Sequence, residues 1–152
     1  NIAAEGNFRL AIETGYPQSV RDFVQLIKEI DHDWVGCTVD VGHQTRYKEF
    51  LAQIEPGNPA TAASIQAYND LTHEIIEQLN TKVFHLHIDD IDPQTWKEHK
   101  PIGTGVIDFP RLIKKLNRMN YKGLLVLEIG GPEIRTSLAD SKDQLEKILS
   151  RI

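Results

Sequence analysis

The chain has 152 residues, of which 40% are hydrophobic and 26% are charged, a composition typical of one ordinary globular domain. Its formal net charge of −5 disfavours nucleic acid as a partner, because proteins that bind duplex DNA usually present a basic surface. The single cysteine, Cys37, excludes an internal disulfide, and no apolar run is long enough to cross a bilayer, so we expect a cytoplasmic protein without a membrane segment.

Apolar periodicity predicts four strand-then-helix units along the chain. The expected strands are residues 8–13, 35–40, 83–88 and 123–129. The expected helices are residues 19–30, 60–79, a segment that starts at 108–110, and residues 138–152. Ser19 and Asp22 fit a capping box for the first helix, and Pro110 suits the first turn of the third.

Strictly alternating strands and helices indicate a parallel sheet with right-handed crossovers, the arrangement of a (β/α)8 TIM barrel in the α/β class. A complete barrel needs eight such units and about 250 residues, whereas this chain offers four units. We therefore expect residues 1–152 to be a half barrel, and favour the C-terminal part of a longer protein. Because a half barrel leaves bare sheet edges, its partner should be the missing N-terminal half or a second copy, and we expect a homo-oligomer.

Side chains alternate between the two faces of a strand, and one face of each predicted strand is apolar. The apolar positions are Phe8, Leu10 and Ile12; Val35, Cys37 and Val39; Phe84, Leu86 and Ile88; and Leu125, Leu127 and Ile129. The opposite face includes Val83 and His85 in the third strand. On this face, the last residue of every strand is of a type that binds metals. These four strand-end residues are Glu13, Asp40, His87 and Glu128.

The active sites of TIM barrels lie at the carboxyl ends of the strands, so these four side chains are predicted to meet there. Two glutamates, one aspartate and one histidine suit a divalent cation, with Mn²⁺ or Mg²⁺ the expected ion and Zn²⁺ or Co²⁺ the alternatives. Taken singly, a strand-end glutamate can equally cap a helix, and an inward histidine can be a hydrogen-bonded core residue. The agreement of four strands is what favours a metal site.

Two further histidines follow the strand ends. His43 comes three residues after Asp40 and could bind the metal or a substrate hydroxyl, or cap a turn. His99 stands before Gly103–Gly105, whose glycines would allow the backbone to approach a ligand closely, although a plain loop turn is the alternative. His99 and this loop are therefore candidates to hold a substrate hydroxyl or phosphate.

Other polar residues are expected to have supporting places. His85 is predicted to lie one layer beneath the metal ligands, in the core or beside them. His32 and His73 are expected to be solvated. Trp96 is expected to line the pocket or simply to pin its loop. The residues expected only to support the end of the third strand are Asp89 and Asp90.

Five short motifs cover nearly the whole chain. They are A-I-E at Ala11–Glu13, V-D-V-G-H at Val39–His43, F-H-L-H-I-D-D at Phe84–Asp90, H-K-P-I-G-T-G at His99–Gly105 and L-V-L-E-I at Leu125–Ile129. In this order and spacing, the sequence resembles the xylose isomerase-like TIM barrel superfamily. That superfamily includes sugar-phosphate isomerases and epimerases, inosose dehydratase, and the apurinic endonucleases of family 2.

The resemblance implies that the four units are the last four of the barrel. It implies a metal held by Glu13, Asp40, His87 and Glu128, with the two glutamates also acting as the catalytic acid/base pair. It further implies that His43 and His99 bind the hydroxyls of a small-molecule sugar or sugar phosphate. The expected activity is divalent-metal-dependent sugar isomerisation or epimerisation, by proton transfer through a metal-stabilised enediolate.

Three alternatives stay open at this point. A dehydratase or lyase of the inosose dehydratase type would use the same site to expel a hydroxide. An apurinic endonuclease is less favoured, because Lys97 stands where that branch of the superfamily has an aspartate two residues before His99. The isolated half barrel could also bind a sugar or partner without turnover, and we expect it to be inactive by itself.

Overall fold

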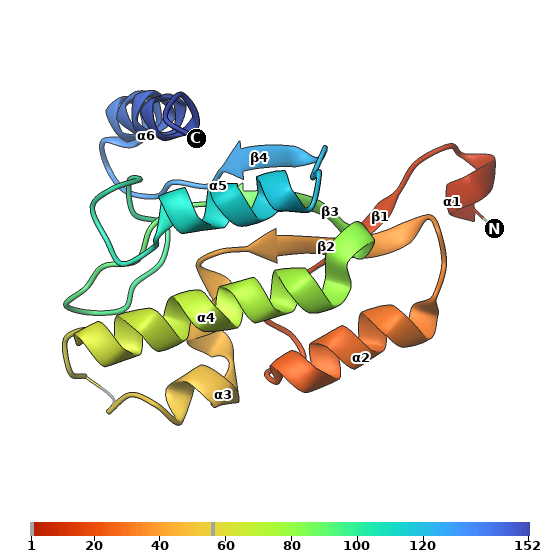
Figure 1. Ribbon diagram of the computed structural model, residues 1–152, viewed down its shortest axis with the longest axis horizontal. Coiled ribbons are helices and arrows are strands. Elements are labelled where there is room, and N and C mark those ends of the chain that lie inside the picture. Colours follow the sequence, from red (N-terminus) through yellow and green to blue (C-terminus); the bar gives the residue numbers. More distant parts are fainter. Residues whose placement is uncertain (1, 56) are drawn as a thin grey trace.

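The computed structural model describes residues 2–55 and 57–152, whose strands form one parallel sheet with the order β1-β2-β3-β4 (Figure 1). The strands are β1 (Leu10–Glu13), β2 (Val35–Asp40), β3 (Val83–Ile88) and β4 (Leu124–Leu127). The α/β class with four parallel strands is thus confirmed. β2 and β3 match their predicted bounds, whereas β1 and β4 are shorter because their outer residues have no strand partner in the described sheet.

The helices are α1 (Ile2–Glu5), α2 (Val20–Ile30), α3 (Lys48–Leu51), α4 (Ala62–Leu79), α5 (Phe109–Arg118) and α6 (Ile134–Leu149), with short 3-10 helices η1 (His43–Arg46) and η2 (Asn80–Lys82). Four helices, α2, α4, α5 and α6, follow the four strands in the predicted alternation, whereas the short helices α1 and α3 were not predicted. Ser19 caps α2 by accepting the Asp22 N–H, as the predicted capping box requires, and its own hydroxyl donates to Glu49. α6 begins four residues earlier than predicted.

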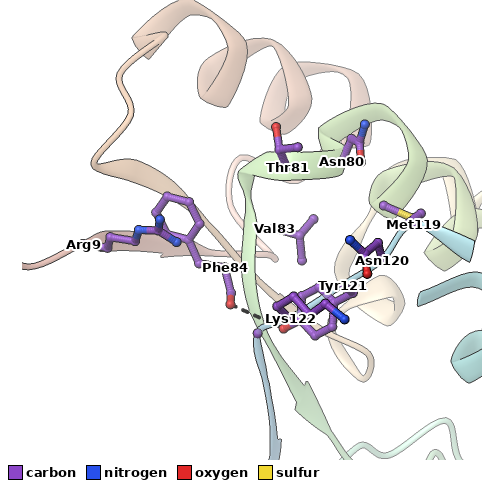
Figure 2. A pocket seen from close by; sticks show the side chains of 10 residues that line it. Arg9, Asn80, Thr81, Val83, Phe84, Met119, Asn120, Tyr121 and Lys122 are labelled. Carbon is purple, nitrogen blue, oxygen red and sulfur yellow. Dashed lines mark hydrogen bonds between the residues drawn. The ribbon is translucent and has the colours of Figure 1, made fainter. Parts of the chain in front are cut away.

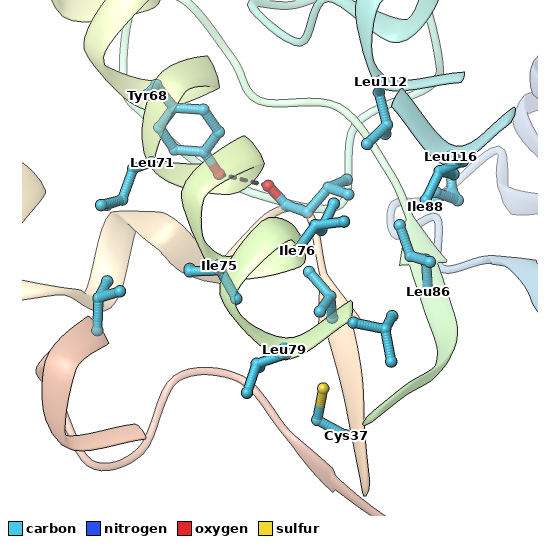
Figure 3. Packing of buried hydrophobic residues seen from close by; sticks show 14 of the residues in the cluster. Cys37, Tyr68, Leu71, Ile75, Ile76, Leu79, Leu86, Ile88, Leu112 and Leu116 are labelled. Carbon is cyan, nitrogen blue, oxygen red and sulfur yellow. Dashed lines mark hydrogen bonds between the residues drawn. The ribbon is translucent and has the colours of Figure 1, made fainter. Parts of the chain in front are cut away.

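The hydrophobic core lies between the sheet and a layer formed by α2, α4 and α5 (Figures 1 and 3). Tyr68 of α4 is fully buried in this core, and its hydroxyl donates to the Val41 and Gly42 carbonyls at 2.6 and 2.9 Å. This bond ties α4 to the carboxyl end of β2. Within the described residues, no helix combines the length and the apolar character that a membrane span requires.

A register shift between β2 and β3 changes which side chains of β3 face the core. Cys37 pairs with Val83, but the next residue, Thr38, pairs with His85. Phe84 is therefore an extra residue, and Val83 is the one buried in the core. The predicted faces of Val83 and Phe84 were wrong, because the inserted residue reverses the alternation before His85.

Phe84 instead lies beside a pocket of about 240 Å³ (Figure 2). The Arg9 guanidinium lies over the Phe84 ring, 4.7 Å from its centroid. Gly36 makes room for this ring, since a Cβ there would lie only 2.7 Å from it. The pocket lies at the amino ends of the strands, away from the strand-end carboxylates. Its lining residues are Arg9, Asn80, Thr81, Val83, Phe84, Met119, Asn120, Tyr121, Lys122 and Gly123.

Apolar side chains remain exposed along the outer strands of the sheet. Leu124 is 69% exposed and Val126 39%, and both share with Glu128 the face away from the helix layer. Leu10 on β1 is 50% exposed. In the described part of the chain, β1 pairs only with β2 and β4 only with β3. The sheet therefore has two open edges and one open face, as a half barrel does.

Candidate metal centre

The four strand-end residues Glu13, Asp40, His87 and Glu128 converge at one edge of the sheet. Glu13 and Asp40 end β1 and β2, His87 is the penultimate residue of β3, and Glu128 follows β4. Because the strands are parallel, their carboxyl ends meet. One ligand atom from each residue lies within 4.8 Å of the others, a spacing that suits ligands around a single cation.

His87 lies at the centre of this group. Its Nδ1 is 2.7 Å from Glu13 Oε1, 2.6 Å from Glu128 Oε2 and 3.7 Å from Asp40 Oδ2. Within the described residues, neither this nitrogen nor Asp40 Oδ2 has a hydrogen-bond partner of good geometry. Buried polar atoms are costly to leave unpaired, and a divalent cation among them would supply the missing partner. The donor set therefore fits the expected metal.

The carboxylates of the group repel one another. Burial is the main cause that raises the pKa of Asp40 above its ordinary value, and the nearby Glu128 and Glu13 raise it further. His43 and the Gly42 N–H, which donates to Asp40 Oδ1 at 2.6 Å, act in the opposite direction. A cation at this position would stabilise the charged carboxylates and so offset the cost of gathering them.

His43 is buried at the start of η1, directly beside Asp40. Its Nδ1 donates to the Thr14 carbonyl at 2.6 Å, because a carbonyl oxygen can only accept. The other ring nitrogen, Nε2, faces Asp40 Oδ2 at 3.5 Å. The hydrogen bond from Nδ1 to Thr14 fixes the orientation of the ring and leaves Nε2 directed into the site.

His99 reaches the same site from the loop between β3 and α5. Its Nε2 lies 3.5 Å from Glu128 Oε1 and has no hydrogen-bond partner among the described residues. Ligand atoms of Asp40, His43 and His99 also lie within 4.8 Å of one another. The structure thus brings both histidines that the sequence singled out to the rim of the four-residue cluster, and the two groups share Asp40.

Two charged residues at the rim were missed by sequence reasoning. Glu98 forms a short ion pair with Arg46, and its other carboxylate oxygen lies 4.0 Å from His43 Nε2. The family resemblance at this loop pointed to Lys97, which is exposed, and not to Glu98 beside it. No periodic signal could have separated the two, because the direction of each side chain depends on loop residues with positive φ, Trp96 at 58° and His99 at 64°.

The glycine-rich loop was predicted to approach a ligand or to form a plain loop turn, and its N–H groups bind a side chain of the protein itself. The N–H groups of Gly103 and Gly105 donate to Asp90 Oδ2 at 3.0 and 2.9 Å, and so are not directed at a ligand. Asp90 is fully buried and also accepts the Ile91 and Ile107 N–H groups. Gly105 is needed because a Cβ there would lie 2.4 Å from Asp90 Oδ1. Asp90 therefore shapes the loop that carries His99.

The remaining predicted positions divide clearly. His85 accepts or donates a 2.6 Å bond with Thr38 and lies 6.0 Å from the His87 ring, as expected for the layer beneath. Trp96 pins its loop by packing against Phe50, with ring centroids 4.9 Å apart. His73 was expected to be solvated, but this expectation was wrong: it is buried on the inner side of α4, against α5.

Comparisons with known proteins agree with the fold. The family described as Xylose isomerase-like TIM barrel matches residues 1–150. Uncharacterized protein MJ1311 of Methanocaldococcus jannaschii is 27% identical over 105 residues, which are 69% of this chain and 29% of that protein. The chain therefore spans less than a third of the length of this curated relative.

Two solved structures share the fold. A D-tagatose 3-epimerase-like protein is 23% identical, with a TM-score of 0.67 over 98% of this chain and 49% of its own. The apo form of 3-keto-D-glucoside 4-epimerase, YcjR, from E. coli is 21% identical, with a TM-score of 0.64 over 96% and 48%. The chain spans about half the length of each. With four parallel strands and a family match over residues 1–150, the chain belongs to the xylose isomerase-like TIM barrel family.

Proposed function

We propose that this chain supplies the metal- and substrate-binding half of a divalent-metal-dependent sugar isomerase or epimerase. The observation that carries the proposal is the position of His87, whose Nδ1 lies between the carboxylates of Glu13 and Glu128 and near that of Asp40. Three carboxylates around one imidazole suit Mn²⁺ or Mg²⁺, and also accept Zn²⁺ or Co²⁺.

The two glutamates are proposed to be the acid/base pair. They come from the two outermost strands of the sheet, so their carboxylates approach the site from opposite sides. A bound divalent cation would polarise the substrate carbonyl and stabilise the enediolate that forms when the neighbouring carbon loses a proton. Glu13 on one side can take that proton, and Glu128 on the other can return one, in either direction.

His43 and His99 are proposed to hold substrate hydroxyls. His43 Nε2 is aimed into the site by the bond of its other nitrogen to Thr14, and His99 Nε2 lies beside Glu128. Neither nitrogen needs to act as a metal ligand, because the four strand-end residues already provide the usual number of protein donors. Support for a sugar as the substrate comes from the names of the two related structures, a D-tagatose 3-epimerase-like protein and a 3-keto-D-glucoside 4-epimerase.

We further propose that residues 1–152 are the C-terminal half of the barrel and that four preceding βα units close it. The open edges of β1 and β4 and the exposed Leu124 and Val126 on the open face support closure by further strands. The order of the sequence motifs supports the C-terminal placement. By itself the half barrel is expected to turn over no sugar, since half of the pocket wall is contributed by the other units.

The test is proton exchange at carbon. The full-length protein, loaded with Mn²⁺, is incubated in D₂O with a panel of ketoses and ketose phosphates, and deuterium incorporation is followed by mass spectrometry. Isomerisation or epimerisation gives a product of unchanged composition with deuterium at the reacting carbon. A product lighter by one water would assign the dehydratase activity instead, and absence of exchange with every substrate would refute the proposal.

A further inference from the structure

The backbone of His99 is held in an unusual conformation by two hydrogen bonds. Its φ is 64°, in the left-handed region that costs a non-glycine residue on the order of 1 kcal/mol. The His99 N–H donates to Asp89 Oδ2 through a short bond, and the His99 carbonyl accepts the Gly130 N–H at 2.9 Å. Both peptide groups of His99 are thus fixed by residues next to the metal cluster.

Asp89 lies beside Asp40, and its side chain is hydrogen-bonded to the backbone of His99. It is fully buried, its only hydrogen bond among the described residues is the one from His99, and its Oδ1 has no partner. The next residue, Asp90, already binds the backbone of the glycine loop, so that loop does not need Asp89 for its shape. Gly42 is the residue that leaves room for Asp89, since a Cβ there would lie 2.7 Å from Oδ2.

The consequence of this arrangement is the direction of the His99 ring. The two hydrogen bonds of the His99 backbone, with Asp89 and with Gly130, act as a clamp that joins the loop after β3 to the loop after β4. With the backbone held in this way, His99 Nε2 lies 3.5 Å from Glu128 Oε1. Without the bond that its N–H donates to Asp89, the backbone of His99 would relax toward φ values that most residues prefer, and the ring would turn away from Glu128.

We propose that Asp89 is a positioning residue, which holds His99 in the left-handed conformation that directs its imidazole to Glu128 and the reacting sugar. This inference rests on the proposed function for its effect on turnover, but the clamp itself is independent of it. Among the described residues, the Asp89 side chain forms no hydrogen bond with the four strand-end residues; its bond is with the His99 backbone, through which it acts.

The test compares four variants of the full-length protein: Asp89→Ala, Asp89→Asn, His99→Ala and the double variant Asp89→Ala/His99→Ala. Asp92→Asn is the matched control, since Asp92 caps the Gln94 and Thr95 N–H groups of the same loop without touching His99. Mn²⁺ affinity is measured by titration calorimetry and turnover by the deuterium exchange assay. The His99 amide proton is observed by NMR in the Mg²⁺-loaded protein.

Asp89→Ala is expected to lower kcat about 10- to 100-fold, the usual effect of losing a supporting residue, with Mn²⁺ affinity unchanged. Asp89→Asn keeps an acceptor for the His99 N–H and should recover most of the loss, while Asp92→Asn should match the wild type. The double variant should be no slower than His99→Ala, because Asp89 acts only through His99. The His99 amide proton should move upfield in Asp89→Ala.

Two results would overturn the proposal. An unmoved His99 amide proton in Asp89→Ala would show that the clamp does not exist in solution. Losses that multiply in the double variant would show that Asp89 acts independently of His99. A wild type without activity on any sugar would refute the proposed function alone, because the NMR measurement still decides whether Asp89 holds His99. If Asp89→Ala does not fold, the amide shift is read in Asp89→Asn, where the exchange of a carboxyl oxygen for an amide oxygen as the acceptor should still move it.

Discussion

The carboxylate of Asp90 accepts the N–H of Gly105 at 2.9 Å, across 15 residues of the chain. With three more N–H groups on the same carboxylate, it fixes the loop that leads from the sheet into α5. The N–H groups of this glycine motif thus shape the loop that carries His99.

Asp90→Ala is expected to lower the free energy of unfolding by about 3 kcal/mol, because it leaves several inward N–H groups without an acceptor. Chemical denaturation followed by circular dichroism measures the change. Asp140→Asn, on the exposed side of α6, is the control and should stay within about 0.5 kcal/mol of the wild type. A loss of less than about 1 kcal/mol in Asp90→Ala would show that water replaces the carboxylate.

Divalent metal should stabilise the folded protein through the strand-end cluster. At a free Mn²⁺ concentration a hundred times the dissociation constant, the expected gain is about 2.7 kcal/mol, measured as a rise in Tm that EDTA reverses. His87→Ala should abolish the metal-dependent part of the rise, since His87 Nδ1 is the atom central to the group. Asp33→Asn, an exposed carboxylate just before the amino end of β2 and so at the opposite end of that strand from Asp40, should keep it. An equal rise in both variants would place the ion elsewhere.

His73 should make stability depend on pH. Burial lowers the pKa of His73, and the nearby Arg111 and Lys115 lower it further. The unfolded chain therefore binds a proton more readily than the folded one as the pH falls below about 6.5, and folding stability is lost in that range by up to about 1.4 kcal/mol per pH unit. Above that range the imidazole is neutral in both states, and its contribution is constant.

The pH effect is measured as the free energy of unfolding between pH 5 and 8 in the wild type and in His73→Leu. The variant removes the titrating group and should flatten the acidic side of the curve, relative to Gln78→Leu, an exposed position on the same helix. Identical slopes in the two variants would mean that the unfolded and folded states protonate His73 alike.

Cys37 should be chemically inert in the native protein. It is fully buried on β2, and burial raises the pKa of its thiol to about 12, so almost no reactive thiolate exists near neutral pH. A thiol reagent such as DTNB is expected to label it only after denaturation, with one equivalent released per chain. Rapid labelling of the native protein would reveal that the edge of the sheet opens readily.

The local pattern of the sequence determined the strands, most of the helices and the four residues of the cluster. β2 and β3 have the predicted bounds, and Asp40 and His87 project from the predicted face. The prediction of these strands and residues succeeded because alternation along a strand is a property of the backbone over a few residues, and because parallel strands end at the same edge of the sheet.

Only the tertiary structure decided what surrounds that cluster. The exchange of faces between Val83 and Phe84 depends on how β3 pairs with β2, and the burial of His73 depends on how α4 meets α5. The backbone of His99 is held by two hydrogen bonds, one that its N–H donates to Asp89 and one that its carbonyl accepts from Gly130 in the loop after β4. Such contacts join residues far apart in the chain, so no local periodicity of the sequence predicts them. They complete a candidate site whose four strand-end residues the sequence alone already indicates.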